Sequence, residues 1–164
     1  MSEVVIAPEP PGRPEIVALI EALDAHAMAL YPAESNHLLD IGALCAPAVT
    51  FLVARRDGEA IGCGAVLNDA RGWGEIKRMY VRPQARGRRI GARILDALEQ
   101  VARARALAML RLETGIHNTE ALALYRRAGF RDCGPFGDYA PDPLSVFMEK
   151  TVGRTGGAER WRGT

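Results

Sequence analysis

Apolar residues recur at intervals of three and four positions in three stretches of the chain, a pattern that predicts helices with one buried face. The first stretch begins at Pro14, and proline suits the first turn of a helix. Its apolar positions are Ile16, Leu19, Ile20, Leu23 and Ala27. A second, short helix is expected over residues 36–44, ending near Pro47.

The other two periodic stretches lie in the second half of the chain. One predicts a helix over residues 90–106, and the other predicts a helix from Asn118 to Gly129, since glycine commonly follows the last turn of a helix. In the helix at 90–106, the apolar face consists of Ile90, Ile94, Leu95, Leu98 and Val101, and the opposite face of Arg93, Glu99 and Arg103.

Short apolar runs between these helices predict strands. Two of them, at 49–54 and 60–67, flank Asp57-Gly58, a dipeptide that favours a tight hairpin turn. A strand at 75–81 completes an antiparallel meander, and the strand after the long helix, at 109–113, should pair in parallel across the crossover. The remaining expected strands are 3–7, 130–133 and 144–152, and the last two form a hairpin around a loop at 134–143.

Together these elements predict one α/β domain over residues 1–152. It should contain a mixed, mostly antiparallel sheet of six or seven strands, with about four helices on its two faces. A chain of 164 residues is long enough to bury a core of its own. Residues 153–164 are expected to form a disordered tail.

Positive charge is concentrated in one segment of an otherwise balanced chain. The formal net charge is +1, whereas residues 77–93 contain seven basic residues and no acidic one. This favours a small anionic ligand over nucleic acid, because Tyr80 is the only aromatic residue interleaved with these charges.

Sequence features also bear on location. No apolar run approaches the roughly 20 residues of a membrane span, and the first residues lack a signal-peptide pattern. Cys45, Cys63 and Cys133 have no metal-type spacing, so they are expected to be reduced thiols. The expectation is a cytoplasmic protein without a metal site or a membrane partner.

The basic segment includes a glycine-containing turn at residues 82–91, which joins the strand at 75–81 to the helix at 90–106. The first turn of a helix carries backbone N–H groups without helical partners, at the positive end of the helix dipole. The sequence therefore predicts a phosphate or pyrophosphate site at the start of this helix.

Two motifs resemble those of the GNAT superfamily of acetyl-CoA-dependent N-acetyltransferases. The first, Tyr80-Val81-Arg82-Pro83 followed by Arg86-Gly87-Arg88-Arg89-Ile90-Gly91, is similar to the family's Arg/Gln-x-x-Gly-x-Gly/Ala pyrophosphate loop. The second is Asn118-Thr-Glu-Ala-Leu-Ala-Leu-Tyr125-Arg-Arg-Ala-Gly129-Phe130. The order of elements matches over residues 14–152. The resemblance implies a sheet that splays apart between its central strands, and acetyl-CoA as the acetyl donor.

The resemblance also implies which residues hold acetyl-CoA. The pantetheine arm should lie along Met79, Tyr80 and Val81, where the N–H of Met79 or Val81 would polarise the thioester carbonyl. Asn118 would contact the pantetheine or mark the start of its helix. The pyrophosphate should lie on Arg86, Gly87, Arg88, Arg89, Ile90, Gly91 and Ala92. Arg89 stands where the family usually has glycine, and we expect it to adopt helical backbone angles, which suit arginine.

Three residues are candidates for the chemistry of acetyl transfer. Tyr125, which also belongs to the expected cofactor site, would protonate the departing thiolate as a general acid. Glu75 lies at the spacing from Arg86 where one branch of the family keeps a glutamate base. Glu113, at the end of the neighbouring strand, is the competing base, and a base acting through water is a third alternative. Neither motif contains a cysteine, so direct attack in a ternary complex is expected.

The expected acceptor is a primary amine of a small molecule or of a protein. Two loops are candidates for its site: residues 31–37, with Glu34 and His37, and residues 135–143, with Asp138 and Asp142. The resemblance also makes a homodimer the expected assembly.

Each assignment has a structural alternative. Asn118 could be only a helix cap, Tyr125 a core residue, and Glu75 and Lys77 a solvated strand face. The arginines between residues 82 and 93 could form a solvated basic face. At the level of function, the alternatives are a non-catalytic module that senses CoA or acetyl-CoA, and a nucleic-acid binder.

Overall fold

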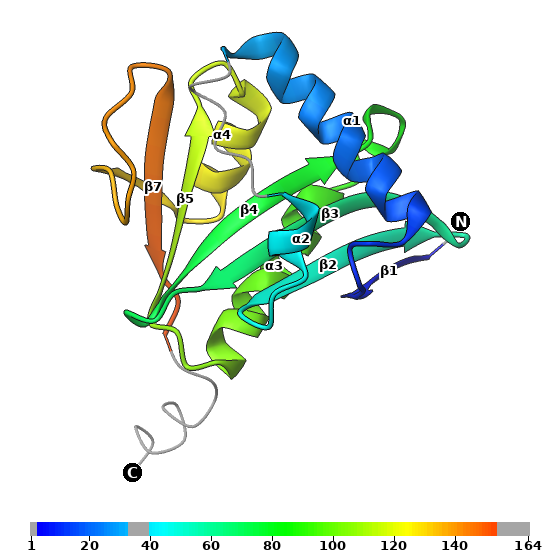
Figure 1. The fold of residues 1–164 in the computed structure, drawn as a ribbon, viewed down its shortest axis with the longest axis horizontal. Coiled ribbons are helices and arrows are strands. Elements are labelled where there is room, and N and C mark those ends of the chain that lie inside the picture. Colours follow the sequence, from blue (N-terminus) through cyan, green and yellow to red (C-terminus); the bar gives the residue numbers. More distant parts are fainter. Residues whose placement is uncertain (1–2, 33–39, 154–164) are drawn as a thin grey trace.

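Seven strands form one sheet in the order β1-β2-β3-β4-β5-β7-β6 in the computed structural model, which describes residues 3–32 and 40–153 (Figure 1). The strands are β1 (Val4–Pro8), β2 (Val49–Arg56), β3 (Glu59–Asn68), β4 (Trp73–Val81), β5 (Met109–Gly115), β6 (Arg131–Cys133) and β7 (Ser145–Thr151). The helices are α1 (Pro14–Leu30), α2 (Ile41–Leu44), α3 (Ile90–Ala104) and α4 (Thr119–Arg127), with a short 3-10 helix at Pro83–Ala85.

The sheet is mixed and mostly antiparallel, which confirms the predicted fold class. Strands β1 to β4 are antiparallel neighbours, β4 and β5 pair in parallel, and β7 lies antiparallel between β5 and β6. The predicted hairpin turn between β2 and β3 is present, with positive φ at Asp57 (52°) and Gly58 (81°). These angles are those of a turn that matches the twist of the flanking strands.

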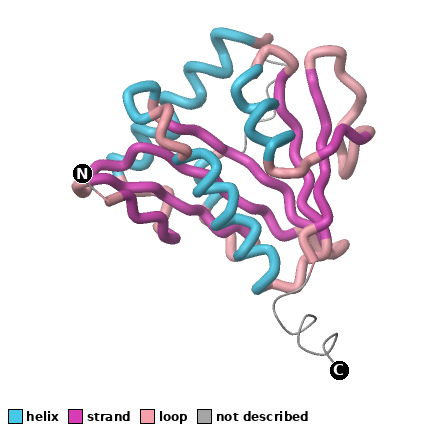
Figure 2. The backbone as a smooth tube through the Cα atoms, turned by 180° about the vertical axis from the view of Figure 1, so that it is seen from behind, coloured by secondary structure: helices cyan, strands magenta, loops and turns pink. Residues whose placement is uncertain are grey.

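Helices cover both faces of the sheet (Figures 1 and 2): α1 and α2 lie on one face, and α3 and α4 on the other. The apolar spacing of α1 buries Ile16, Leu19 and Ile20 against β2 and β3. The predicted apolar face of α3 is buried against the opposite side of the sheet, at Ile90, Ile94, Leu95 and Leu98.

The two central strands separate part of the way along their length. β4 and β5 pair from Trp73 with Met109 to Ile76 with Leu112, and no pairing follows. Beyond this point β4 is irregular, because the register with β3 shifts between Cys63 and Ala65 and Arg78 has a φ of 61°. A bulge of this kind bends a strand. The predicted splay is therefore confirmed, and we call this opening between β4 and β5 the fork.

One prediction for the α3 surface is wrong. Glu99, expected on the polar face, is only 4% exposed. Its carboxylate accepts two hydrogen bonds from Lys150 Nζ of β7, at 2.9 and 3.0 Å, and lies 3.3 Å from Arg103. Lys150 also donates to the carbonyl of Ala128 at the end of α4 (2.6 Å). The carboxylate can be buried because Lys150 compensates its charge, and this cation comes from a strand far along the chain.

Two other predictions are only partly testable. Of the helix expected over 36–44, the described part is α2, which begins after Asp40. The Asp40 carboxylate caps this helix by accepting a hydrogen bond from the N–H of Ala43. Residues 33–39 lie outside the described residues, and so does the tail expected over 153–164 except for Gly153. Among the described helices, none combines the length and apolarity that crossing a membrane requires.

The Glu99 network makes a testable prediction about stability. Lys150→Met should lower the free energy of unfolding by about 3 kcal/mol, because it leaves a buried carboxylate short of its main partner. Arg131→Met is the matched control, since Arg131 pairs with Glu149 on the same sheet edge but is 73% exposed; it should cost less than about 1 kcal/mol. Equal losses in urea denaturation would show that the burial of Glu99 has no such effect.

Candidate active site

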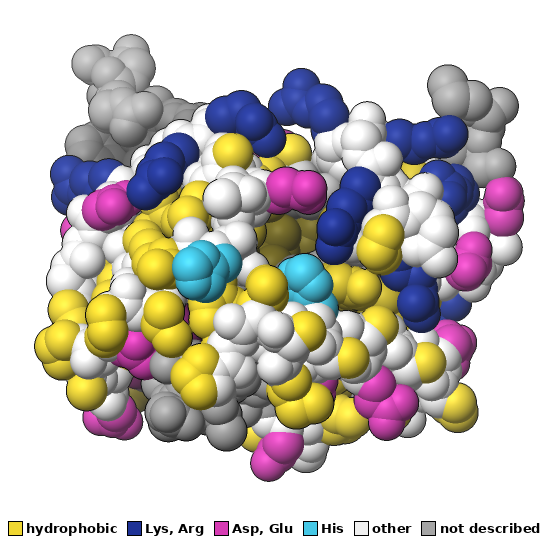
Figure 3. Space-filling view, turned by 90° about the horizontal axis from the view of Figure 1, so that it is seen from above, with side chains coloured by type: hydrophobic (Ala, Val, Ile, Leu, Met, Phe, Trp, Pro, Cys, Tyr) yellow, Lys and Arg dark blue, Asp and Glu magenta, His cyan; other side chains and the backbone are white. Residues whose placement is uncertain are grey.

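A cleft of about 1130 Å³ opens at the fork. Its walls come from both sides of the sheet: α1 on one side, and the start of α3 together with α4 on the other. Figure 3 shows the hollow with basic side chains and histidines around it, and His26 and His117 are among its lining residues. The cleft therefore passes between β4 and β5 and joins the two faces of the sheet.

The α3 end of the cleft has an unusual number of unpaired backbone donors. Within the described chain, no hydrogen bond is found for the backbone N–H groups of residues 87–92, and the first helical bond runs from Arg93 N to Arg89 O (3.0 Å). Gly87 has a φ of 88°, which only glycine adopts without strain. Such a row of N–H groups at the positive end of a helix dipole fits a phosphate or pyrophosphate.

The backbone of Arg89 differs from the prediction. Helical angles were expected there, but Arg89 has φ 59° and ψ 25°, which is the left-handed region. The residue lies just before α3, where the chain must turn from Gly87 into the helix. A left-handed conformation costs a residue with a Cβ atom about 1–2 kcal/mol, so this loop is strained where glycine would not be.

The basic residues of the segment differ in their surroundings. Arg86 Nε donates to the carbonyl of Val81 (3.0 Å), and Arg82 Nε donates to that of Ala60 (3.2 Å). Arg78 is buried and forms an ion pair with Asp24 of α1. Arg86 and Arg89 line the cleft, whereas Arg88 is exposed and is not among the lining residues.

The predicted pantetheine strand lies along the cleft. Met79, Tyr80 and Val81 all line it, on the part of β4 that has left β5. An extended ligand could hydrogen-bond to this open strand edge as an added strand does. The first turn of α3 lines the same wall through Ile90, Gly91 and Ala92.

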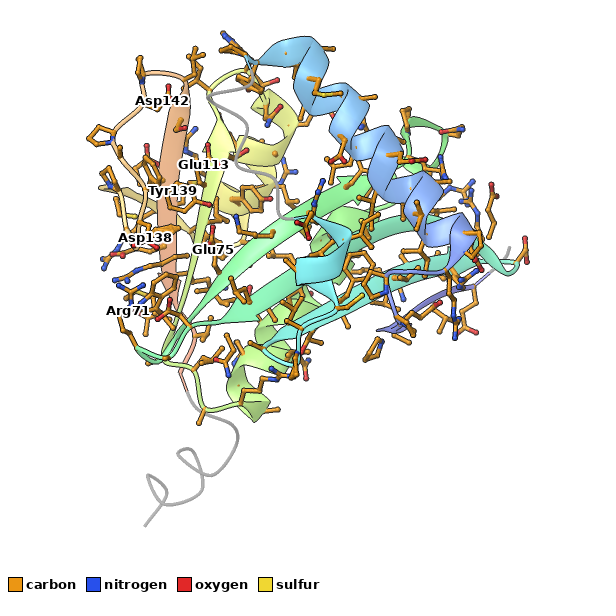
Figure 4. The ribbon with its side chains drawn as sticks, in the orientation of Figure 1. Arg71, Glu75, Glu113, Asp138, Tyr139 and Asp142 are labelled. Carbon is orange, nitrogen blue, oxygen red and sulfur yellow. The ribbon has the colours of Figure 1, made fainter. Side chains whose placement is uncertain are left out.

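Glu75 of β4 lies next to Tyr139, a residue of the loop between β6 and β7 (Figure 4), and Lys77 contacts both. The Tyr139 hydroxyl donates to Glu75 Oε2 at 2.5 Å and accepts from Lys77 Nζ at 2.9 Å, and Lys77 Nζ lies 3.3 Å from Glu75 Oε2. Because Glu75 is 7% exposed, the alternative of a solvated strand face is wrong. Burial, and then the charge of Glu75, raises the pKa of Tyr139, which keeps its hydroxyl protonated.

Glu113 and Tyr125 both line the cleft at the fork. Arg111 is the register partner of Glu75, so their side chains face the same side of the sheet. Side chains alternate along a strand, and Glu113, two residues after Arg111, therefore faces that side too. Glu113 Oε2 accepts from the hydroxyl of Ser145 (2.7 Å). Tyr125 is 5% exposed, and burial followed by the negative charge of Glu113 raises its pKa, so its phenol stays neutral near neutral pH.

Asn118 stands at the position that caps α4, but its side chain makes no capping hydrogen bond. Nδ2 donates instead to Thr114 Oγ1 at 3.2 Å, and the residue lines the cleft. The simple alternative of a side-chain helix cap is therefore wrong for this residue.

Tyr31 joins α1 to the loop before α4, a contact that the sequence did not indicate. Its hydroxyl accepts from the backbone N–H of His117 (3.0 Å), and the two rings stack with centroids 5.7 Å apart. Gly115 makes this approach possible, because a Cβ atom there would lie 1.9 Å from the Tyr31 hydroxyl. This contact fixes one side of the cleft.

The two loops proposed for the acceptor have different outcomes. Glu34 and His37 lie outside the described residues. Asp138 is exposed and does not line the cleft, and the carboxylate of Asp142 accepts from the N–H of Leu144 (2.8 Å) within its own turn. Tyr139 of the same loop does line it, although nothing in the sequence distinguished it from its neighbours.

All three cysteines are free thiols, and burial raises the pKa of Cys63 to about 12. In the part of the chain that the structure describes, no group of three or more His, Cys, Asp or Glu side chains could hold a metal ion. The arrangement at the fork is thus one of carboxylates and phenols next to a row of N–H donors.

Comparisons with known proteins agree with this arrangement. Residues 16–130 match the model of the Acetyltransferase (GNAT) family. A protein of Azospirillum brasilense named IAA acetyltransferase is 55% identical over 153 residues, covering 93% of this chain and all of the relative. A Klebsiella pneumoniae structure described as an acyl-CoA N-acyltransferase has a TM-score of 0.78 and 44% identity, covering 91% of this chain and 97% of that one.

A more distant structure shows likeness of fold alone. The PaiA N-acetyltransferase of Thermoplasma acidophilum, solved in complex with coenzyme A, has a TM-score of 0.67 at 19% identity, covering 91% of this chain and 99% of that chain.

The strained backbone at Arg89 can be tested by two substitutions. Arg89→Gly should raise the free energy of unfolding by about 1 kcal/mol, because glycine accepts a positive φ. Arg89→Ala removes the same charge but keeps a Cβ atom, so it should give no such gain. An equal gain from both variants in urea denaturation would assign the effect to charge instead of backbone conformation.

Proposed function

The chain belongs to the Acetyltransferase (GNAT) family, and from this premise we propose that it transfers the acetyl group of acetyl-CoA to a primary amine by direct attack in a ternary complex. The family makes it an acyltransferase. The observation that supports the finer proposal is one cleft, which joins a row of unpaired N–H groups to the side chains of Glu75, Glu113 and Tyr125.

The donor would occupy the α3 side of the cleft. Its pyrophosphate would accept hydrogen bonds from the N–H groups of residues 87–92, with the charges of Arg86 and Arg89 nearby. Its pantetheine arm would run along Met79–Val81 towards the fork, past Asn118. The thioester would then lie between the two faces of the sheet, within reach of an acceptor that enters from the α1 side.

The transfer would need three proton movements. The acceptor ammonium first loses a proton to Glu75 or Glu113, and the amine nitrogen then attacks the thioester carbon. The N–H of Met79 or Val81 would stabilise the oxyanion that forms. The nitrogen of the tetrahedral intermediate still carries two protons and must lose one. When the C–S bond breaks, the sulfur takes the phenolic proton of Tyr125, the extra proton of the nitrogen passes to the Tyr125 phenolate, and the products are an N-acetyl amide and CoA. The raised pKa of Tyr125 keeps its phenol in the protonated form that a general acid needs.

The acceptor remains defined by chemistry alone, as a primary amine of a small molecule or of a protein. The name of the Azospirillum relative makes IAA a compound to include in the first acceptor panel. A cytoplasmic location and a homodimer remain expectations.

Tyr125→Phe tests the proposal. We expect acetyl-CoA to raise the melting temperature of the wild type and of the variant alike, because binding does not need the hydroxyl. Turnover with the best amine of the panel, followed as release of the CoA thiol, should fall about 100-fold, the range of general acid catalysis.

ADP serves as the control ligand, because it carries a pyrophosphate but no thioester arm. It should raise the melting temperature less than acetyl-CoA does. Full turnover in Tyr125→Phe would contradict the general-acid role, and the absence of a shift with acetyl-CoA would contradict the donor site itself.

A further inference from the structure

The two oxygens of the Glu75 carboxylate have different surroundings. Oε2 accepts from the Tyr139 hydroxyl at 2.5 Å and lies 3.3 Å from Lys77 Nζ. For Oε1, no hydrogen bond or ion pair is found within the described chain. This oxygen is also not fully buried. Because Glu75 lines the cleft, Oε1 is the oxygen that remains for a ligand.

Tyr139 reaches Glu75 from a loop that aromatic packing holds in place. Its ring contacts Phe136 and Phe147, with centroids 5.1 and 5.4 Å apart, and its backbone N–H donates to the carbonyl of Phe136 (3.1 Å). Phe136 also packs against Trp73 of β4, at 5.3 Å. The hydroxyl is therefore fixed relative to β4, even though it belongs to the connection between β6 and β7.

One hydrogen bond and one ion pair at the same oxygen restrict how the carboxylate can turn. A glutamate side chain otherwise samples several rotamers, and its terminal torsion is broad. The Tyr139 hydroxyl remains a donor because the pKa of this residue is raised, first by burial and then by the charge of Glu75. Lys77 supplies a positive charge on the same side, since its Nζ donates to the Tyr139 hydroxyl at 2.9 Å.

The hydrogen bond found at Glu113 has a different kind of donor. Its Oε2 accepts from Ser145 Oγ, a neutral hydroxyl, at 2.7 Å. The charge of Glu113 contributes to the raised pKa of both Tyr125 and Tyr139, which places a second negative charge at the fork. Its charge would help attract an ammonium group, whereas Glu75 offers an oriented oxygen.

We propose that Tyr139 is a positioning residue, which holds Glu75 Oε2 so that Oε1 receives the ammonium group of the acceptor and takes its proton. The inference rests on the proposed function and deepens it by selecting Glu75 over Glu113 as the base. In this step an N–H bond of the ammonium breaks, an O–H bond forms at Oε1, and the nitrogen lone pair becomes available for attack.

Tyr139→Phe tests the inference, because phenylalanine keeps the aromatic packing and removes only the hydroxyl. With acetyl-CoA saturating, kcat for the amine should fall at least 10-fold. The KM for acetyl-CoA and the thermal shift with acetyl-CoA should stay at their wild-type values. Asp138→Asn is the matched control, since Asp138 is the preceding residue, is exposed and lies outside the cleft; it should behave as wild type.

Glu75→Gln and Glu113→Gln separate the inference from the proposed function. A wild-type kcat in Tyr139→Phe, or a larger loss of kcat in Glu113→Gln than in Glu75→Gln, would overturn the inference while acetyl transfer stands. If Tyr139→Phe loses kcat and acetyl-CoA also raises its melting temperature less than that of the wild type, Tyr139 has a structural role only. A wild type that binds acetyl-CoA and acetylates no amine would overturn the proposed function together with the inference.

Discussion

The end of pairing between β4 and β5 determines the rest of the site. The two strands share hydrogen bonds only as far as Ile76 and Leu112, and the bulge at Arg78 then bends β4 away, with the Arg78 side chain paired to Asp24 of α1. A continuous sheet would separate the helices on its two faces. The fork instead joins them through one cleft, so groups carried by α3, α4 and α1 can act on the same ligand.

Charge is divided along this cleft in a way that suits two different substrates. The α3 end offers N–H groups and arginines, which favour an anionic donor. The α1 side of the fork offers Glu75 and Glu113, which favour a cationic acceptor. Lys77 offsets part of this negative charge, because its Nζ lies 3.3 Å from Glu75 Oε2, but one cation faces two carboxylates. The two substrates would thus approach from opposite faces and meet where the strands part.

The elements could be predicted from the sequence because their signals are local. The apolar spacing in α3 and the Asp57-Gly58 turn depend on neighbouring residues alone, and the motif around Gly87 and Tyr125 identified the wall of the cleft. The burial of Glu99 could not be predicted in this way, since Lys150 lies 51 residues away.

The contact of Tyr139 with Glu75 likewise spans 64 residues. It depends on the packing of the loop between β6 and β7 against the aromatic cluster of Trp73, Phe136 and Phe147. The backbone of Arg89 was missed because the path of the loop, not the preference of the residue, sets its φ. The most direct measurement is a crystal structure with CoA. The account predicts the pyrophosphate on the N–H groups of residues 87–92 and the thiol in the fork near Glu75 and Glu113. A pyrophosphate bound elsewhere, or a thiol that stays outside the fork, would contradict it.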